Sequence, residues 1–170
     1  MIRTLDGVSP QIHETAFVSE TAYIIGDVVI GPGSSVWPGT VIRGDSARIT
    51  IGANTNIQDN SVLHSDHGAI IGDYVTIGHR VMCHASKIGD HCLLGNGSVL
   101  NEGAELGEYC LVAAGAVVIE GMVVPARRIV AGVPARERGD VEERHLQLMK
   151  WANDSYVART TRYKAQGTLE

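Results

Sequence analysis

Aliphatic residues return at every sixth position along most of the chain, and many six-residue units carry a small or β-branched residue four places later. Two inward-facing positions in every six residues predict short strands separated by tight turns. Three such units close one triangular coil, and successive coils stack at about 4.8 Å, the spacing of neighbouring strands. The repeating aliphatic positions are Val18, Ile24, Ile30, Val36 and Ile42; Ile51, Ile57 and Leu63; Ile71, Ile77 and Cys83; and Ile88, Leu94, Leu100, Leu106, Val112, Val118, Val124 and Val130.

The register of the repeat resets between some coils, and we expect these resets at corners. If Ile51 opens the first face of a coil, then Ile57 and Leu63 open the second and third faces. A column of glycines supports this assignment, because glycine follows the first-face aliphatic residue in consecutive coils. These glycines are Gly31, Gly52, Gly72, Gly89 and Gly107. The sequence therefore predicts an all-β solenoid, a parallel β-helix, in which Cys83 points into the core and is no ligand.

The C-terminal segment has a different periodicity. From Val141 onward, apolar residues recur at helical spacing, which predicts an amphipathic α-helix along the coils. These residues are Val141, His145, Leu148, Met149, Ala152, Tyr156 and Tyr163. Pro134 and Gly139 predict a corner before the helix. We expect the β-helix over residues 1–135 and the amphipathic helix and tail, packed on it, over residues 136–170.

Composition and charge exclude several functions. The chain has 170 residues, a net charge of −5 and a pI near 5.8, so we expect no nucleic-acid partner. No apolar run is long enough to span a membrane, and the N-terminus resembles no export signal. The three cysteines have no CxxC spacing, which is typical of reduced, buried thiols. We therefore expect a soluble cytoplasmic protein of one domain.

Two histidines are predicted to stack on the third face. Its outward position holds Arg43, His64, His84 and Asn101 in successive coils. His64 and His84 are thus neighbours about one strand spacing apart, which suits two imidazoles that bind one ion. His79 lies on the second face, about 15 Å from His84 along five extended residues. One chain alone cannot bring the three histidines together.

A threefold homotrimer can complete the site, because rotation places the second face of one subunit against the third face of the next. Each metal site would then take His64 and His84 from one chain and His79 from its neighbour. Asp59 lies beneath His79 in the predicted register, with Gln58 beside it, so both would reach across the same interface.

Ordered motifs resemble the gamma-class carbonic anhydrases over almost the whole chain. They are RGD at 43–45, NIQD at 56–59, SVLH ending at His64, GHRVMCH ending at His84, and the C-terminal WANDSYV. The resemblance implies a left-handed β-helix, which departs from the usual right-handed crossover. It also implies that the three histidines bind catalytic zinc, with Fe²⁺ or Co²⁺ as alternatives, and that Gln58 contacts the metal-bound water. Arg43, Asp45 and Asp59 would join subunits, and we assign Asn56 to this structural group.

The implied reaction is reversible hydration of carbon dioxide to bicarbonate by metal-bound hydroxide. A proton must then reach solvent. In well-known members of the family, a longer loop carries glutamates for this transfer, whereas here the loop is HSDHGA, residues 64–69. Asp66 and His67 are its titratable side chains besides the ligand, and His67 is our candidate shuttle. Tyr156 and Asn153 are expected at the rim of the site, with Tyr156 a candidate catalytic residue.

Other function classes remain open, since fold alone does not fix function. An acyl-CoA thioesterase or acyltransferase can use the same scaffold, and GVPA at 132–135 is common to both groups. Three converging histidines argue against an acyltransferase, which uses one, and the loop that carries that base is missing. The third alternative is a trimeric metal-binding protein without turnover.

Overall fold

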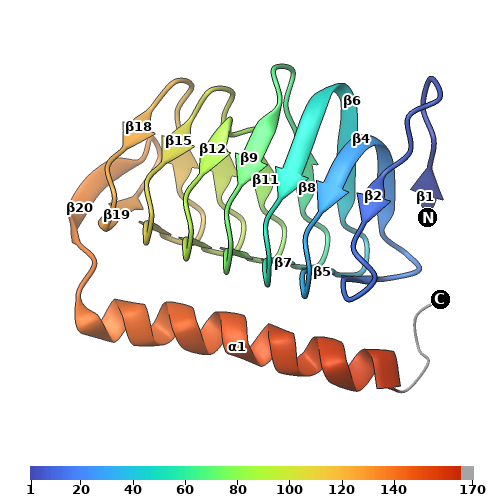
Figure 1. Ribbon diagram of the computed structural model, residues 1–170. Coiled ribbons are helices and arrows are strands. Elements are labelled where there is room, and N and C mark those ends of the chain that lie inside the picture. Colours follow the sequence, from blue (N-terminus) through green and yellow to red (C-terminus); the bar gives the residue numbers. More distant parts are fainter. Residues whose placement is uncertain (166–170) are drawn as a thin grey trace.

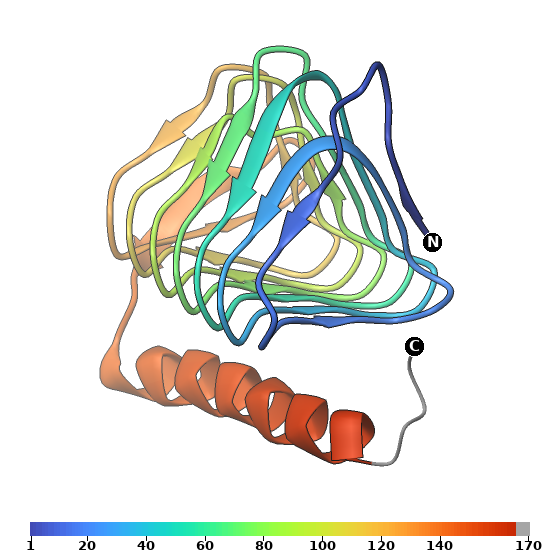
Figure 2. The same ribbon diagram turned by 45° about the vertical axis from the view of Figure 1, so that its right-hand side comes forward.

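The structure is a computed structural model that describes residues 1–165, so the last five residues of the predicted tail lie outside the described residues. A stack of three-sided coils forms the body, and one helix lies beside it (Figure 1). The turned view shows the triangular outline of the coils (Figure 2). This is the predicted left-handed β-helix of six-residue repeats.

The strands stack in parallel columns on three faces. The first face contains β2 (Gln11–Ile12), the end of β4 (Tyr23–Ile30), the end of β6 (Val41–Ile51), β9 (Ala69–Ile71), β12 (Lys87–Ile88), β15 (Glu105–Leu106) and β18 (Val123–Val124). The second contains β3 (Phe17–Val18), β5 (Ser35–Val36), β7 (Asn56–Ile57), β10 (Thr76–Ile77), β13 (Leu93–Leu94), β16 (Leu111–Val112) and β19 (Arg128–Ala131). The third contains β1 (Ile2–Arg3), the starts of β4 and β6, β8 (Val62–His64), β11 (Met82–Cys83), β14 (Val99–Leu100) and β17 (Val117–Val118).

The pairing register agrees with the six-residue repeat. Ile57 pairs with Ile77 on the second face, and Leu63 pairs with Cys83 on the third. The glycine column has a steric cause: a Cβ built on Gly52 would lie 2.7 Å from the carbonyl carbon of Gly72 in the next coil. Only glycine lets consecutive coils approach this closely.

The core is the inside of the coils. The repeating aliphatic side chains from Ile24 to Val130 are almost completely buried, and Cys83 is 3 % exposed among them. Burial raises the pKa of the Cys83 thiol to about 11, which makes it a poor metal ligand at neutral pH. Its predicted inward orientation is confirmed.

The chain leaves the solenoid through a strand that the sequence did not predict. β20 (Arg136–Asp140) pairs antiparallel with β19 and covers the last edge of the second face. It occupies the segment where we expected a corner and the start of the helical part. β20 becomes the outermost strand in place of β19, and its exposed, charged side chains disfavour further strand pairing at this edge.

Helix α1 (Glu143–Ala165) runs back along the second face toward the first coils, and it contacts β5, β7 and β10 (Figure 1). Tyr156 packs edge-on against Trp37, with ring centroids 5.1 Å apart, and Phe17 belongs to the same aromatic cluster. Leu148, which we expected on the inner face, is 48 % exposed, whereas the polar side chain of Asn153 is buried. In the described part of the chain, no helix is both long and apolar enough to cross a membrane.

Candidate metal centre

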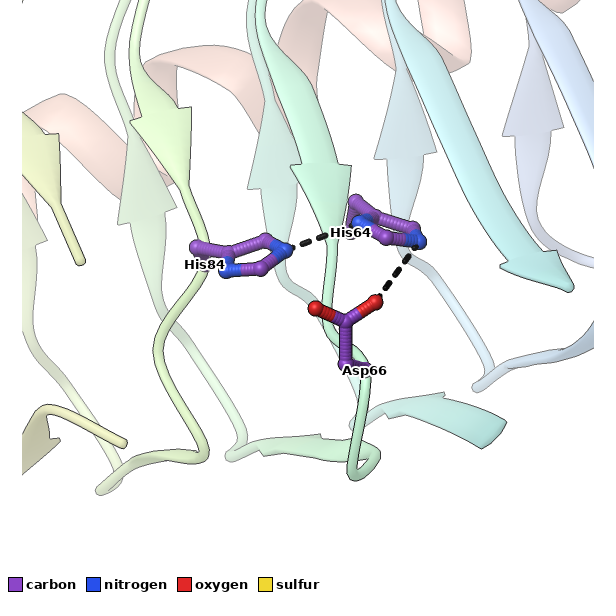
Figure 3. Close-up of side chains that lie close together, drawn as sticks. All are labelled: His64, Asp66 and His84. Carbon is purple, nitrogen blue, oxygen red and sulfur yellow. Dashed lines mark hydrogen bonds and ion pairs between the residues drawn. The ribbon is translucent and has the colours of Figure 1, made fainter. Parts of the chain in front are cut away.

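His64 and His84 form the centre of the candidate site. His64 ends β8, and His84 follows β11 in the next coil, so the parallel pairing of Leu63 with Cys83 stacks the two rings. Nδ1 of His64 lies 2.8 Å from Nε2 of His84, and the ring centroids are 4.9 Å apart. Figure 3 shows the two rings pointing toward one another from adjacent coils. Their side chains are 11 % and 17 % exposed.

Carboxylates face the outer nitrogens of both rings. Nε2 of His64 lies 2.9 Å from Oδ1 of Asp45, and Nδ1 of His84 lies 2.5 Å from Oε2 of Glu102. Nε2 of His64 hydrogen-bonds to Asp45, so its Nδ1 presents a lone pair to Nε2 of His84 at 2.8 Å. Oε2 of Glu102 is buried beside Nδ1 of His84 but accepts no hydrogen bond from the described residues, so a proton on Nδ1 of His84 would face this oxygen and leave two lone pairs opposed between the rings. A cation between them removes this conflict, and carboxylates behind ligating histidines are the usual support of a metal site. The donor set therefore fits a divalent transition metal.

Asp66 is the third side chain of this group. Its ligand oxygen and the nearest ring nitrogens of His64 and His84 all lie within 4.8 Å of one another (Figure 3). Its Oδ1 is 3.9 Å from Nε2 of His64, and the side chain is 58 % exposed. Sequence reasoning treated Asp66 only as a titratable residue of the loop. One chain thus gathers two imidazoles and one carboxylate.

His79 does not belong to that group. Its Nδ1 lies 3.0 Å from Oδ2 of Asp59, the residue predicted beneath it, and its Nε2 lies 3.3 Å from the hydroxyl of Tyr156. The ring is therefore held at both nitrogens within its own chain. Arg43 forms an ion pair with Asp45 rather than with Asp59 in this single chain.

Gln58 lies beside His79, as the register predicts. Its side chain is buried, and Nε2 donates to Oδ1 of Asn56 at 3.0 Å. Nδ2 of Asn56 in turn donates to Oγ1 of Thr76 at 2.9 Å. Gln58, His79 and Tyr156 line a groove of about 400 Å³ between the second face and α1. This network fixes the amide nitrogen of Gln58, and none of the described residues donates a hydrogen bond to its carbonyl oxygen.

Asn153 was expected with Tyr156 at the rim of the site. Its Nδ2 instead donates to the backbone oxygen of Asn54 at 2.8 Å, and the side chain lines a cavity on the opposite flank of α1 from His79. The two residues are three positions apart, so their side chains leave the helix only about 60° apart, yet they reach different sides of its contact with the solenoid. Only Tyr156 reaches His79.

His67 contacts a residue that sequence reasoning missed. Its Nδ1 lies 3.1 Å from Oε1 of Glu102, whose other oxygen faces His84, and the His67 side chain is 83 % exposed. Burial pushes the pKa of Glu102 upward, but the hydrogen bond with His67 and the proximity of His84 hold it below the usual range. Asn101 is the next position after His84 in the third-face column, and Glu102 directly follows it. This neighbourhood could have identified Glu102 from the sequence.

Asp45 is held in its ionised form. Burial opposes the shift, but hydrogen bonds from Arg43 and His64 lower the pKa of Asp45 below its usual value. A carboxylate that stays ionised keeps His64 in one ring orientation.

Comparisons with known proteins agree with this architecture. The family model described as "Bacterial transferase hexapeptide (six repeats)" matches residues 9–44 and 85–120. The "Carbonic anhydrase" of Geobacillus kaustophilus is 42% identical over 167 residues, which cover 97% of this chain and 92% of that protein. "Gamma carbonic anhydrase 1, mitochondrial" of Arabidopsis thaliana is 41% identical over 145 residues, which cover 79% of this chain and 53% of that protein. A solved structure, a "putative acetyltransferase" of Bacillus cereus, superposes with a TM-score of 0.92 at 34% identity over 97% of both chains.

The fold and its repeat define a hexapeptide-repeat protein. Within that class, the chain belongs to the gamma carbonic anhydrase family.

Proposed function

We propose that this protein is a carbonic anhydrase that interconverts carbon dioxide and bicarbonate at a metal held between subunits of a homotrimer. The observation that carries the proposal is the pair of His64 and His84, whose inner nitrogens are 2.8 Å apart while carboxylates face their outer nitrogens. Relatives that cover most of this chain and bear the name carbonic anhydrase support the reaction class.

An outward apolar stripe on the third face supports the trimer. Val62 and Met82 are each 38 % exposed, pair with each other across the coils, and lie two residues before His64 and His84. A second copy that covers this stripe removes exposed apolar surface from water. Threefold rotation brings a neighbour's second face, which carries His79, toward it. His64, His84 and the neighbour's copy of His79 would then hold the metal together.

Three neutral imidazoles backed by carboxylates suit Zn²⁺, and Fe²⁺ and Co²⁺ accept the same ligands. When bound, such a metal lowers the pKa of its water to about 7, so that hydroxide is available at neutral pH. Asp45, Asp59 and Glu102 would each fix the ring of one ligand histidine. This orientation keeps the ligand nitrogens pointed at one place before any metal binds.

The remaining residues would position the substrate and move the proton. Gln58 has its amide nitrogen committed to Asn56, so its carbonyl oxygen is the end that would accept a hydrogen bond from the attacking group and align it. Tyr156 lies beside Nε2 of His79, and its hydroxyl becomes free to donate to a substrate oxygen once that nitrogen is a ligand. Glu102 and the exposed His67 form a path from the site to solvent, in place of the longer family loop.

One observation favours an acyl-transfer enzyme as the second candidate. The "putative acetyltransferase" structure matches 97% of this chain. In keeping with this likeness, the groove beside His79 is partly apolar, with Leu93 and Trp151 in its wall. The paired histidines favour the anhydrase, because acyl transfer needs one general base and no second imidazole 2.8 Å away.

Stopped-flow hydration of carbon dioxide tests the proposal. Protein purified without oxygen is assayed with zinc and with ferrous iron, beside a His84→Ala variant whose trimer is verified by ultracentrifugation. We expect activity that disappears in the variant. Metal-loaded protein without hydration activity would refute the anhydrase. Hydrolysis of acyl-CoA by that same protein would then establish the second candidate, and inactivity on both substrates a metal-binding protein without turnover.

A further inference from the structure

Helix α1 has two flanks, and only one of them faces the candidate metal centre. Trp151 and Tyr156 line the groove of His79, whereas Leu146 and Asn153 line a separate cavity of about 270 Å³. The second cavity lies where the first and second faces of the solenoid meet.

A column of rings forms the solenoid wall of this cavity. Tyr74 stacks on His91 with centroids 4.9 Å apart and planes 5° apart, and His91 stacks on Tyr109 at 4.7 Å and 8°. All three backbones are left-handed, with φ values of 55°, 58° and 55°. The preceding coil has Asn54 at this corner position, a residue type that tolerates such a backbone better. The left-handed backbone is a general feature of the solenoid corners, shared by Asn60, Arg80 and Arg127. What distinguishes this corner is the run of three stacked rings in successive coils.

The helix supplies the opposite wall and one polar group. Met149 is 5 % exposed and Leu146 lies beside it, so this wall is apolar. Asn153 is 4 % exposed, and its Nδ2 donates to the backbone oxygen of Asn54. None of the described residues donates a hydrogen bond to its carbonyl oxygen Oδ1. Oδ1 is not one of the fully buried, unpaired side-chain atoms, so it remains accessible in the cavity wall as an acceptor for a ligand N–H.

The rim of the cavity has no net charge. Nζ of Lys150 pairs with Oδ2 of Asp154 at 2.6 Å, so each charge is already compensated. An anionic ligand would meet Asp154, and a cationic one would meet Lys150. The volume is also small beside ordinary ligand pockets of about 300–1,000 Å³, and it suits one bicyclic ring better than a nucleotide with its phosphates.

We propose that this cavity binds a neutral, planar nitrogen heterocycle with an N–H donor, of the purine base or nucleoside class. The ring lies between the column of Tyr74, His91 and Tyr109 and the apolar side of α1. Its N–H donates to Oδ1 of Asn153. This site is independent of the metal centre and of the proposed anhydrase activity.

Calorimetric titration of the intact protein with adenosine tests the proposal. We expect saturable binding of one adenosine per chain. N6,N6-dimethyladenosine, which lacks an N–H donor on its base, should bind about tenfold more weakly, the cost of one lost hydrogen bond. AMP should bind no more tightly than adenosine. Absence of saturable binding at millimolar adenosine, or tenfold tighter binding of AMP, would overturn the proposal.

Variants connect the binding to this cavity. Leu146→Trp fills the cavity from its half-buried edge and should weaken adenosine binding at least tenfold while leaving the circular dichroism spectrum unchanged. Asn153→Leu should produce a similar loss and abolish the preference for adenosine over its dimethyl analogue. Trp151→Ala, on the other flank of α1, is the matched control and should bind as the unmodified protein does. If Leu146→Trp folds and still binds adenosine fully, the ligand occupies another place and the assignment is wrong.

Discussion

Mixing two defective variants tests whether each metal site is shared between subunits. In the proposed trimer, a site takes His64 and His84 from one chain and His79 from the next. A His79→Ala chain keeps the first half, and a His84→Ala chain keeps the second. The two variants are mixed in equal amounts and assemble at random. A site is then intact only where a His79→Ala chain supplies His64 and His84 and the next chain around the axis, a His84→Ala chain, supplies His79. The probability is about one half times one half, so about a quarter of all sites recover.

Purification through two different affinity tags sharpens this expectation, because trimers of a single type are removed. Every mixed trimer, whether two-to-one or one-to-two, then holds one intact site of its three. Metal content and carbon dioxide hydration should therefore both return to about one third of the values for the unmodified protein. Native mass spectrometry verifies the composition of the trimers, and metal analysis gives the readout that does not depend on turnover.

The matched control combines His64→Ala with His84→Ala. Both changes damage the same half of the site, so no arrangement of these chains restores it, and the mixed trimers should stay empty. The reasoning would be refuted if verified mixed trimers of His79→Ala and His84→Ala gained no metal. It would equally be refuted if His79→Ala trimers alone bound metal fully, since the site would then lie within one chain.

Three further predictions concern assembly, acid stability and thiols. Arg43→Ala should weaken the trimer more than it changes metal preference, because it frees Asp45 at the proposed interface, and an unchanged trimer in ultracentrifugation would contradict this role. The pKa of Asp45 is lowered on folding, so its stabilisation is present above the unfolded carboxyl pKa and is lost as the pH falls through the folded value. In Asp45→Asn, the free energy of unfolding measured with urea should therefore fall less steeply between about pH 6 and pH 2 than it does in the unmodified protein. Cys83, Cys92 and Cys110 are buried, so a thiol reagent should label them only after denaturation, and rapid labelling of the native protein would argue against the packed core.

The sequence predicts the coils well, because a solenoid uses the same short-range pattern in every turn. The period of six fixes which side chains are inside, and the stacking of His64 on His84 follows from counting positions. The steric reason for Gly52 also repeats from coil to coil. β20 could not be predicted in this way, because it pairs antiparallel at the terminal edge and does not belong to the six-residue repeat.

Helix α1 was harder to orient from its sequence. A hydrophobic pattern places Leu148 inside, but the inner face of the helix meets backbone carbonyls at the solenoid corner, and these favour a donor such as Asn153. Glu102 was missed for a related reason. Glu102 lies 18 residues beyond His84 in the chain. Its place in the site depends on contacts with His67 and His84 that form only in the folded coils.

The identity of the third ligand is the point at which sequence and single-chain geometry differ. Asp66 is already near the histidine pair, but its side chain is 58 % exposed, so fixing it on a metal costs side-chain entropy. The ring of His79 is already held by Asp59 and Tyr156, so less side-chain entropy is lost when its nitrogen binds a metal. We therefore expect His79, rather than Asp66, to be the third metal ligand. Asp66→Ala trimers should retain metal that His79→Ala trimers lose, and the reverse result would place the site within one chain.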